Sequence, residues 1–345
     1  MKAAVLKAVN EIGCETVAAP TLAPGDLLIK VRAATICGTD IRILRGRKTA
    51  GVRYPSVLGH EFSGEIADTG GHSQFHVGEA VAVCPAFACG SCDACTRGAE
   101  NLCRNLVAMG YEIDGAFADY VRVPAQGVAS GNVFPLPQGL SFEAAALAEP
   151  LSCVINGQER VGVALGDTVA VLGAGPIGLL HVQLAKLSGA SKIIVSQRSA
   201  LRREAALAAG ADHVINPQDE NVVERVRALT GGAGVDVAIC AIGDPGLAND
   251  AIRMVRPRGR VSLFAGFVKG LQAELDVNAI HYSELVVTGA FGLTRRQFGL
   301  ALDLIASGKI NAPSLISHRF PLEDFTAAVA TAEQGSAIKV AITST

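Results

Sequence analysis

The chain has 345 residues, of which 50% are hydrophobic and 18% are charged, so it is neither a disordered chain nor a small disulfide-stapled scaffold. At about 150 residues per domain, this length favours two domains. Its 30 Lys and Arg against 32 Asp and Glu give a net charge of −2, without long runs of one sign. Neither nucleic acid nor an anionic membrane is therefore an expected partner.

No segment is predicted to cross a membrane or to direct export. The most apolar stretch, residues 168–185, is interrupted by glycines and a proline, and the N-terminus contains Lys2, Lys7 and Asn10. We therefore expect a cytoplasmic protein. Nine cysteines would not persist as disulfides in that reducing compartment, so a cluster of them indicates a metal site.

The N-terminal part, up to about residue 125, predicts an irregular and mostly β domain, because its apolar runs are short and separated by glycine and proline. The expected strands cover residues 3–9, 27–34, 64–67, 80–83 and 118–123.

From about residue 147, strands and helices alternate, which predicts βαβ units on a parallel sheet. The strands are expected at residues 168–172, 192–196, 213–216 and 235–241, with helices at 177–187, 201–209 and 222–230. Strands at 260–264 and 285–290 could extend this sheet to six, and a helix at 298–307 and a strand at 338–342 follow. Several strands are continuous apolar runs, as expected when helices cover both faces of a sheet.

A glycine-rich turn follows the strand that ends at residue 172 and opens the next helix. In this strand–turn–helix context the motif predicts a dinucleotide site, because glycine lets a pyrophosphate approach the backbone N–H groups at the helix start. The alternative is an ordinary tight turn. The expected cofactor-binding residues of this turn are Gly173, Gly175, Pro176, Ile177 and Gly178.

The segment at residues 196–203 bears on the choice of cofactor. NAD sites of this type place an acidic residue about 20 positions after the glycines, whereas this segment has Gln197 and three arginines. Because arginine can clamp a 2′-phosphate, we expect NADP, held by Ser196, Gln197, Arg198 and Arg202, with NAD as the other cofactor to test. The alternative is that these arginines only solvate the start of a helix.

Four cysteines, Cys89, Cys92, Cys95 and Cys103, lie within fifteen residues of one another. Four thiolates at this spacing can hold one tetrahedral Zn²⁺ with no open position, which predicts a structural zinc site. Closely spaced cysteines also hold iron–sulfur clusters, and this is the alternative.

A second set of metal-binding side chains is more widely spaced. Cys37, His60 and Glu61 offer a thiolate, an imidazole and a carboxylate, and Glu149 lies where the alternating pattern begins. Such a set can hold a catalytic zinc with one open position, although a single buried histidine is more often a core residue. The His60–Glu61 pair is not a zinc-protease motif, because that motif needs a second histidine where Gly64 stands.

In this order the motifs resemble the zinc-dependent medium-chain alcohol dehydrogenase family, and specifically its polyol (sorbitol-like) branch. The resemblance extends over essentially the whole chain. Its motifs are CGTD at residues 37–40, GHE at 59–61, the four cysteines, DGAFADYV at 114–121, EPL at 149–151 and GAGPIG at 173–178.

The resemblance implies an α/β fold that combines a Rossmann doubly wound parallel sheet with a mostly β, GroES-like catalytic domain, and an active site in the cleft between them. The implied domains are a GroES-like catalytic domain at 1–148 with a structural zinc lobe at 89–103, a Rossmann domain at 149–290, and a C-terminal segment at 291–345 that completes the catalytic domain.

The resemblance also assigns roles at the active site. Cys37, His60 and Glu61 match the catalytic zinc ligands, Asp40 matches the carboxylate that orients the histidine, and Glu149 stands where polyol enzymes have glutamate. Zinc bound by one thiolate and one carboxylate is neutral, and a second carboxylate makes the site anionic. We therefore expect Glu149 chiefly to hold the zinc-bound water and to bind the metal only when substrate is absent.

Two features depart from the family. Thr39 matches the hydroxyl that passes on the substrate proton, but Arg42 stands where a histidine often ends the relay, so the proton would leave through Glu149 and water. Ile43 and Gly292 correspond to the tyrosine and arginine that contact polyol, which argues against sorbitol itself. The basic residues between positions 42 and 48 could grip a substrate phosphate or carboxylate, although such a run is more often a solvated face.

We therefore expect a zinc-dependent oxidoreductase that transfers hydride between NADP(H) and a secondary alcohol or ketone of a polyol or related polyhydroxy compound, with two Zn²⁺ per chain. The alternatives are a sugar-phosphate or threonine-like amino-alcohol dehydrogenase and, from another class, a non-catalytic nucleotide-binding sensor. The intact ligand set argues against the sensor. The strand at 285–290 resembles the family's subunit-pairing edge, which implies a homodimer or homotetramer.

Overall fold

The computed structural model describes residues 1–267 and 270–343 and divides into two compact units. Unit 1 contains Met1–Ser152 and Leu293–Thr345, and unit 2 contains Cys153–Gly292. The sequence placed these boundaries after residues 148 and 290. In the structure the two units meet inside the continuous helix α5 (Ala148–Val161) and after Gly292, within four and two residues of those positions. In the described part of the chain, no helix has the length and hydropathy required to span a bilayer.

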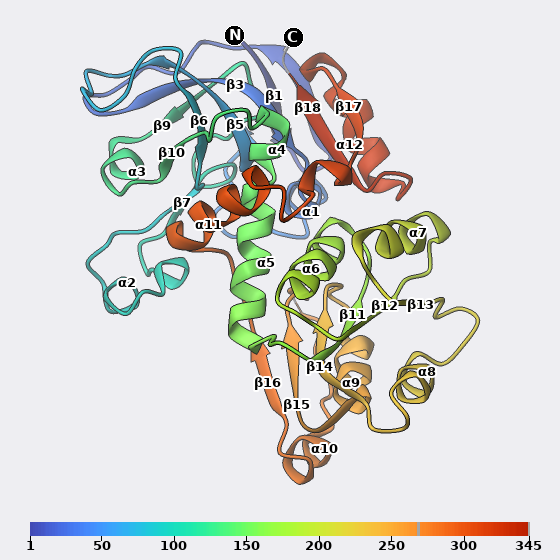
Figure 1. The fold of residues 1–345 in the computed structure, drawn as a ribbon. Helices are drawn as coiled ribbons and strands as arrows, with labels where there is room; N and C mark the ends of the chain where they lie inside the picture. Colours follow the sequence, from blue (N-terminus) through green and yellow to red (C-terminus); the bar gives the residue numbers. More distant parts are fainter. Residues whose placement is uncertain (268–269, 344–345) are drawn as a thin grey trace. The chain divides into compact units, whose positions relative to one another are not determined.

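Unit 1 is built from short strands with small helices between them (Figure 1). Its N-terminal elements are β1 (Lys2–Ala8), β2 (Glu11–Thr16), β3 (Leu27–Thr35), α1 (Gly38–Leu44), β4 (Ser56–Val57), β5 (Glu61–Asp68), β6 (Ala80–Val83), β7 (Ala86–Phe87), α2 (Asp93–Thr96), η1 (Glu100–Leu102), β8 (Val107–Ala108), β9 (Tyr120–Val123), α3 (Ala125–Ala129), β10 (Val133–Pro135) and α4 (Phe142–Ala146). Its C-terminal elements are α11 (Arg295–Ala306), η2 (Ala312–Leu315), β17 (Ile316–Phe320), η3 (Leu322–Asp324), α12 (Phe325–Glu333) and β18 (Lys339–Thr343).

The main sheet of unit 1 has the order β10-β6-β5-β3-β18-β17, with β9 also paired to β3. Along β3, Leu27, Ile29 and Val31 are buried and alternate with half-buried residues, so one face of the strand points into the core. The C-terminal strand β18 pairs antiparallel with β3, Ala341 lying opposite Thr35. The last strand of the chain therefore completes a sheet that the first strands begin.

Unit 2 alternates strands and helices. Its elements are β11 (Thr168–Leu172), α6 (Pro176–Leu187), β12 (Lys192–Ser196), α7 (Ala200–Ala209), β13 (His213–Ile215), α8 (Val222–Leu229), β14 (Val235–Cys240), α9 (Pro245–Met254), β15 (Val255–Leu263), α10 (Val277–Tyr282) and β16 (Val286–Gly289).

These strands form one parallel sheet of order β13-β12-β11-β14-β15-β16, which confirms the predicted fold class and the predicted six strands (Figure 1). Val169, Val171, Val237 and Ile239 are fully buried, as continuous apolar strands covered on both faces require. β15 begins at Val255 and not at residue 260, because a register shift lies between its first pairing with β14 and the rest. The alternation of apolar and polar residues does not indicate such a register shift, so the sequence did not predict it.

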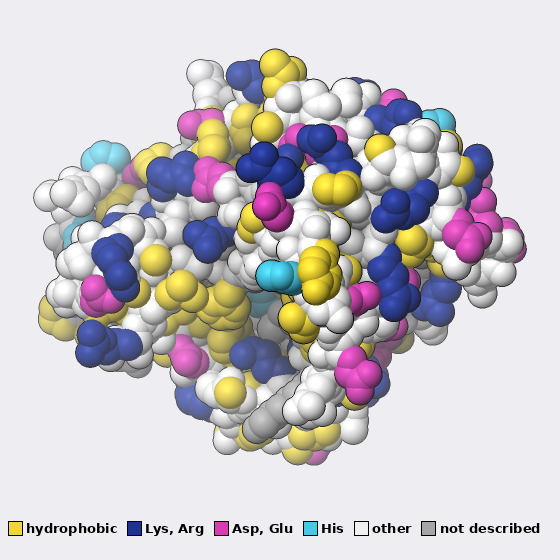
Figure 2. All heavy atoms as spheres, turned by 90° about the horizontal axis from the view of Figure 1, so that it is seen from below, with side chains coloured by type: hydrophobic (Ala, Val, Ile, Leu, Met, Phe, Trp, Pro, Cys, Tyr) yellow, Lys and Arg dark blue, Asp and Glu magenta, His cyan; other side chains and the backbone are white. Residues whose placement is uncertain are grey.

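The surface carries both signs of charge. On the face drawn in Figure 2, Lys and Arg side chains lie among Asp and Glu side chains, as the net charge of −2 suggests.

Candidate metal centre and cofactor site

Strand pairing in unit 1 brings three potential metal ligands together. Cys37 is the N-cap of α1, directly after β3, while His60 and Glu61 stand at the start of β5. β3 and β5 are antiparallel neighbours with Thr35 opposite Glu61, so the three side chains meet at one end of this strand pair. Their thiol sulfur, imidazole nitrogen and carboxylate oxygen all lie within 4.8 Å of one another. This sulfur, nitrogen and oxygen set fits a zinc ion.

Asp40 holds two of these groups in place. Its Oδ2 accepts a hydrogen bond of 2.8 Å from the Cys37 backbone N–H, and its Oδ1 lies 3.4 Å from Nδ1 of His60. Burial alone would lower the pKa of His60, but the Asp40 carboxylate and the Cys37 thiol raise this pKa well above its usual value. With Nδ1 directed to Asp40, Nε2 is the nitrogen left for a metal, as is usual for a carboxylate-oriented histidine ligand.

Glu61 has two buried partners that the sequence did not suggest. Its Oε2 accepts a hydrogen bond from the Thr35 hydroxyl and lies 2.5 Å from Nζ of Lys339. Lys339 is only 4% exposed. The sequence does place Lys339 directly before the apolar run of the last strand. Its partner could not be predicted, because the strand pairing that brings Lys339 to Glu61 is not visible in the sequence.

Glu149 lies in the first turn of α5 and is buried. It is not part of the group of three whose ligand atoms lie within 4.8 Å of one another. Its carboxylate contributes to the raised pKa of Tyr111, of which burial is the main cause, and to the raised pKa of Lys339, which burial opposes and Glu61 chiefly raises. Thr39 is half-buried, and its backbone N–H is 3.4 Å from the Cys37 sulfur.

Tyr111 is a further neighbour that the sequence did not single out. Its ring lies edge-on to the His60 ring, with centroids 6.1 Å apart, and Nζ of Lys48 lies 4.5 Å from its centroid. Burial raises the pKa of Tyr111 to about 12. Ile43, which takes the place of the polyol-binding tyrosine, is fully buried in the core of unit 1.

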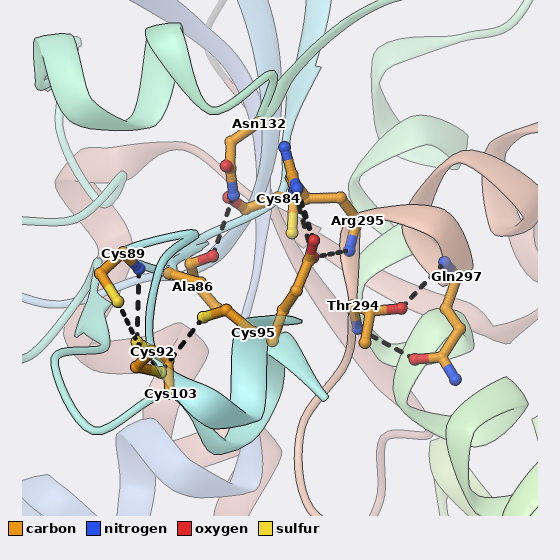
Figure 3. Close-up of polar contacts among 12 residues, drawn as sticks. Cys84, Ala86, Cys89, Cys92, Cys95, Cys103, Asn132, Thr294, Arg295 and Gln297 are labelled. Atoms are coloured by element: carbon orange, nitrogen blue, oxygen red, sulfur yellow. Dashed lines mark hydrogen bonds and ion pairs between the residues drawn. The ribbon is translucent and has the colours of Figure 1, made fainter. Parts of the chain in front are cut away.

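The four clustered cysteines form a second potential metal site (Figure 3). Sulfur–sulfur distances are 3.5 Å for Cys92–Cys95, 3.8 Å for Cys92–Cys103 and 3.4 Å for Cys89–Cys103. Tetrahedral zinc with bonds of about 2.3 Å requires sulfurs about 3.8 Å apart, so the cluster fits this ion. N–H groups of Ser91 and Cys92 lower the pKa of the Cys89 thiol to about 5, whereas burial raises the pKa of the Cys95 thiol to about 12.

An ion pair joins this cysteine lobe to the C-terminal segment within unit 1. Arg295 donates from Nε to Glu100 Oε2 at 3.1 Å, and its backbone N–H donates to the same oxygen at 3.2 Å. Arg295 is placed by the start of α11, where Thr294 and Gln297 form a reciprocal capping box (Figure 3). The lobe is therefore held by its own sulfurs and by a residue nearly 200 positions later in the chain.

The glycine turn of unit 2 has the shape of a phosphate-binding loop. Gly173 has a positive φ of 104°, and a Cβ on Gly178 would lie 1.9 Å from the Gly173 carbonyl oxygen. A Cβ on Gly175, the N-cap of α6, would meet no atom within 4 Å. The fold thus requires the first and third glycines, whereas the space beside the second is open to a ligand at the helix N-terminus.

The predicted cofactor residues at and after the end of β12 differ in their exposure to solvent. Ser196 and Gln197 are buried, Arg198 is exposed and Arg202 is half-buried. Burial lowers the pKa of Arg202. Arg203 donates to the Gln197 carbonyl at 3.0 Å, so this third arginine fixes the turn.

The fold and the candidate sites together define a class of protein. Its members combine a parallel sheet of the dinucleotide-binding type with a β unit that carries a thiolate, an imidazole and a carboxylate close together. Residues 23–138 match the model of the alcohol dehydrogenase GroES-like domain, and residues 176–307 match that of the zinc-binding dehydrogenase. The chain belongs to the zinc-dependent medium-chain alcohol dehydrogenase family.

Relatives of known name agree with this membership. The chain is 38% identical to L-threonine 3-dehydrogenase of Pyrococcus furiosus over 92% of its length and 91% of the relative's. It is 36% identical to sorbitol dehydrogenase of Bacillus subtilis, over 94% of its own length and 91% of that relative's.

Solved structures are similarly close. A zinc-binding dehydrogenase from Sinorhizobium meliloti 1021, bound to NADP, has a TM-score of 0.93 and 35% identity over 99% of both chains. An alcohol dehydrogenase from Escherichia coli CFT073, complexed with NADH, has a TM-score of 0.91 and 32% identity over 100% of this chain and 99% of the other. Similar proteins therefore carry either nicotinamide cofactor.

Proposed function

We propose that the protein oxidises a secondary alcohol of a polyol or related polyhydroxy compound with NADP, and reduces the corresponding ketone in the reverse direction. The observation that carries this proposal is the meeting of Cys37, His60 and Glu61 within 4.8 Å, with the Thr39 backbone N–H 3.4 Å from the Cys37 sulfur. A family member that only bound nucleotide would not need such a group.

The bound cofactors would supply the central chemistry: zinc acts as a Lewis acid toward the alcohol oxygen, and NADP accepts the hydride. The chain's own residues position and deprotonate the substrate. Asp40 fixes the His60 ring, and Lys339 offsets the charge of Glu61. Thr39 would relay the proton: its hydroxyl takes the alcohol proton while giving up its own, which the Glu149 carboxylate accepts and later releases to water. Arg42 cannot act as the base that histidine provides elsewhere.

A second zinc is proposed at Cys89, Cys92, Cys95 and Cys103, where sulfurs 3.4–3.8 Å apart leave no open position. Its role would be structural, since it would close a lobe made of two short strands and two short helical segments.

NADP is proposed over NAD because the segment after β12 offers Arg198 and Arg202 and no carboxylate between residues 196 and 203. The relative bound to NADP supports this choice, while the relative complexed with NADH makes NAD the necessary comparison.

A second candidate is an amino-alcohol dehydrogenase. It is favoured by the 38% identity to L-threonine 3-dehydrogenase. The reaction type and the metal would be the same, so only the substrate distinguishes the two candidates.

We also infer a homo-oligomer paired along β16. This strand is the last in the order of its sheet, and Val286 on it, together with Val277 and Tyr282 on α10, is more than half exposed. An unpaired strand edge with apolar neighbours commonly pairs with a second copy. Light scattering of the purified protein tests this, and a monomer at micromolar concentration would contradict it.

The test of function is a panel of polyols, L-threonine and the corresponding ketones, assayed with both cofactors on zinc-loaded protein. Polyol turnover that is lost in Cys37→Ser and reduced in Glu149→Gln, with cofactor binding retained, would support the proposal. Faster turnover of L-threonine would favour the second candidate. Cofactor binding without turnover of any compound would favour a sensor.

A further inference from the structure

The four basic residues between positions 42 and 48 have different surroundings. Arg45 is exposed and forms an ion pair with Glu333, and Arg47 is exposed. Lys48 is half-buried, and its Nζ lies over the Tyr111 ring, which in turn contacts His60 edge-on. One cation of this loop thus reaches back toward the candidate metal centre.

The backbone explains why Lys48 turns inward. The Arg42 carbonyl accepts the N–H groups of both Arg47, at 2.7 Å, and Lys48, at 3.1 Å, which closes the loop on the end of α1. α1 begins at the metal-binding Cys37, so this loop and the metal centre are parts of one short segment. The Tyr111 ring contacts both groups: its centroid lies 6.1 Å from that of the His60 ring and 4.5 Å from Nζ of Lys48.

Lys48 forms no close ion pair with a carboxylate in the described part of the chain. Across residues 1–267 and 270–343, no carboxylate oxygen lies within 4.0 Å of its Nζ. Burial lowers the pKa of Lys48, the Glu112 carboxylate opposes this, and the Arg42 guanidinium adds to the lowering. The Glu112 Oε2 accepts a hydrogen bond from the Ala108 N–H at 2.8 Å. A half-buried ammonium group is more stable when an anion lies within contact of it.

A contact with Tyr111 alone would also hold Lys48 in place, since a cation over an aromatic ring is attracted to its face. That role predicts no dependence on the charge of the substrate. A half-buried ammonium group with no described carboxylate within 4.0 Å, beside a ring that contacts His60, favours a binding role.

We propose that Lys48 binds an anionic group of the substrate, a carboxylate or a phosphate, while the substrate hydroxyl lies at the metal centre. This inference rests on the proposed dehydrogenase function and narrows its substrate to polyhydroxy acids or sugar-alcohol phosphates. It makes Lys48 a specificity-determining residue, because a neutral polyol of the same length would leave its ammonium group unpaired.

The experiment compares matched substrates on zinc-loaded enzyme. Each neutral polyol of three to six carbons is paired with its aldonate and with its terminal phosphate, and kcat/KM is measured for wild type, Lys48→Met and Lys48→Arg. Arg47→Met, an exposed cation of the same loop, is the matched control. Calorimetric binding of the same compounds gives a second measurement that does not depend on turnover.

We expect wild type to prefer one anionic series over the neutral polyols. Lys48→Met should lower kcat/KM for that series about ten- to a hundredfold, as expected for a lost charge-assisted hydrogen bond, and leave the neutral polyols within about threefold. Lys48→Arg should recover part of the loss, and Arg47→Met should change neither series. Preference for aldonates identifies a carboxylate, and preference for the phosphates identifies a phosphate.

The inference would be overturned if Lys48→Met lowered kcat/KM equally for neutral and anionic compounds. It would also be overturned if no anionic compound bound better than its neutral partner. Either result would leave the dehydrogenase proposal standing. Absence of turnover with every compound would instead overturn the proposed function. In that event the binding comparison still decides whether Lys48 recognises anions.

Discussion

Nζ of Lys339 lies 2.5 Å from Oε2 of Glu61, and the two side chains are 4% and 1% exposed. The same carboxylate belongs to the candidate metal group and accepts a hydrogen bond from Thr35. Glu61 therefore has a buried cationic neighbour, and breaking a buried ion pair by removing one partner is strongly destabilising.

Replacing Lys339 by methionine should leave this charge buried and unpaired. We expect the free energy of unfolding of metal-free protein to fall by about 3–5 kcal/mol, measured by urea denaturation at pH 7. The double variant Lys339→Met/Glu61→Gln should recover part of the loss. Lys309→Met, at an exposed lysine, should stay within about 0.5 kcal/mol of wild type. Unchanged stability in Lys339→Met would show that the pair does not hold the two strands together.

The two glycines of the cofactor turn should respond differently to alanine. Gly178→Ala would force a Cβ to 1.9 Å from the Gly173 carbonyl oxygen, so we expect a folding defect. Gly175→Ala has open space, so the protein should fold normally but bind NADP at least about tenfold more weakly, because the methyl group occupies the ligand's approach. Thermal denaturation and fluorescence titration check the two effects. Normal cofactor affinity in Gly175→Ala would show that the pyrophosphate lies elsewhere.

Cofactor preference should follow the charge after β12. In Gln197→Asp and in Arg198→Ala, the ratio of kcat/KM for NADP to that for NAD should fall at least about tenfold, because the 2′-phosphate is repelled or loses its clamp. Arg225→Ala, at an exposed arginine paired with Glu220, is the control and should leave the ratio unchanged. Equal or better use of NAD by wild type would contradict the NADP proposal.

Metal content should separate the two candidate sites. Plasma mass spectrometry should find two zinc ions per chain in wild type and one in Cys37→Ser, corresponding to the two groups of ligands. Cys92→Ser should lose the other zinc and lower the thermal stability, because the cysteine lobe then relies only on contacts such as Glu100–Arg295. Iron with visible absorption in wild type would instead support a cluster at the four cysteines.

A pH-dependent contribution to stability should come from Asp26. Burial alone would raise the pKa of Asp26, but N–H groups of Ala23 and Ala125 and the guanidinium of Arg122 lower it below 3.8. A lowered folded-state pKa stabilises the protein above the unfolded-state value, and this contribution is lost as the pH falls through the folded-state value. Asp26→Asn should therefore cost about 2 kcal/mol at pH 7, and the difference from wild type should shrink below about pH 4. A pH-independent difference would contradict this assignment.

The sequence predicted the parallel sheet of unit 2 well, because its signals are local. Each strand is a continuous apolar run, and each helix follows at a short interval, so periodicity places both. The four cysteines and the glycine turn are equally local, since neighbouring residues close both structures. Strands in unit 1 were harder to bound: β5 begins at Glu61 and not at residue 64, because the charged glutamate hides the start of the strand.

Sequence alone thus determined the fold class, the cysteine cluster and the glycine loop, because the residues that form the cluster and the loop are close together in the chain. Only the tertiary structure decided which distant side chains surround the candidate metal centre. Lys339 reaches Glu61 because β18 joins β3, and Lys48 reaches Tyr111 because a loop folds back on α1. No local sequence pattern connects charged residues on strands that are far apart in the chain. Which of them pair is decided by the register of the long-range strand contacts.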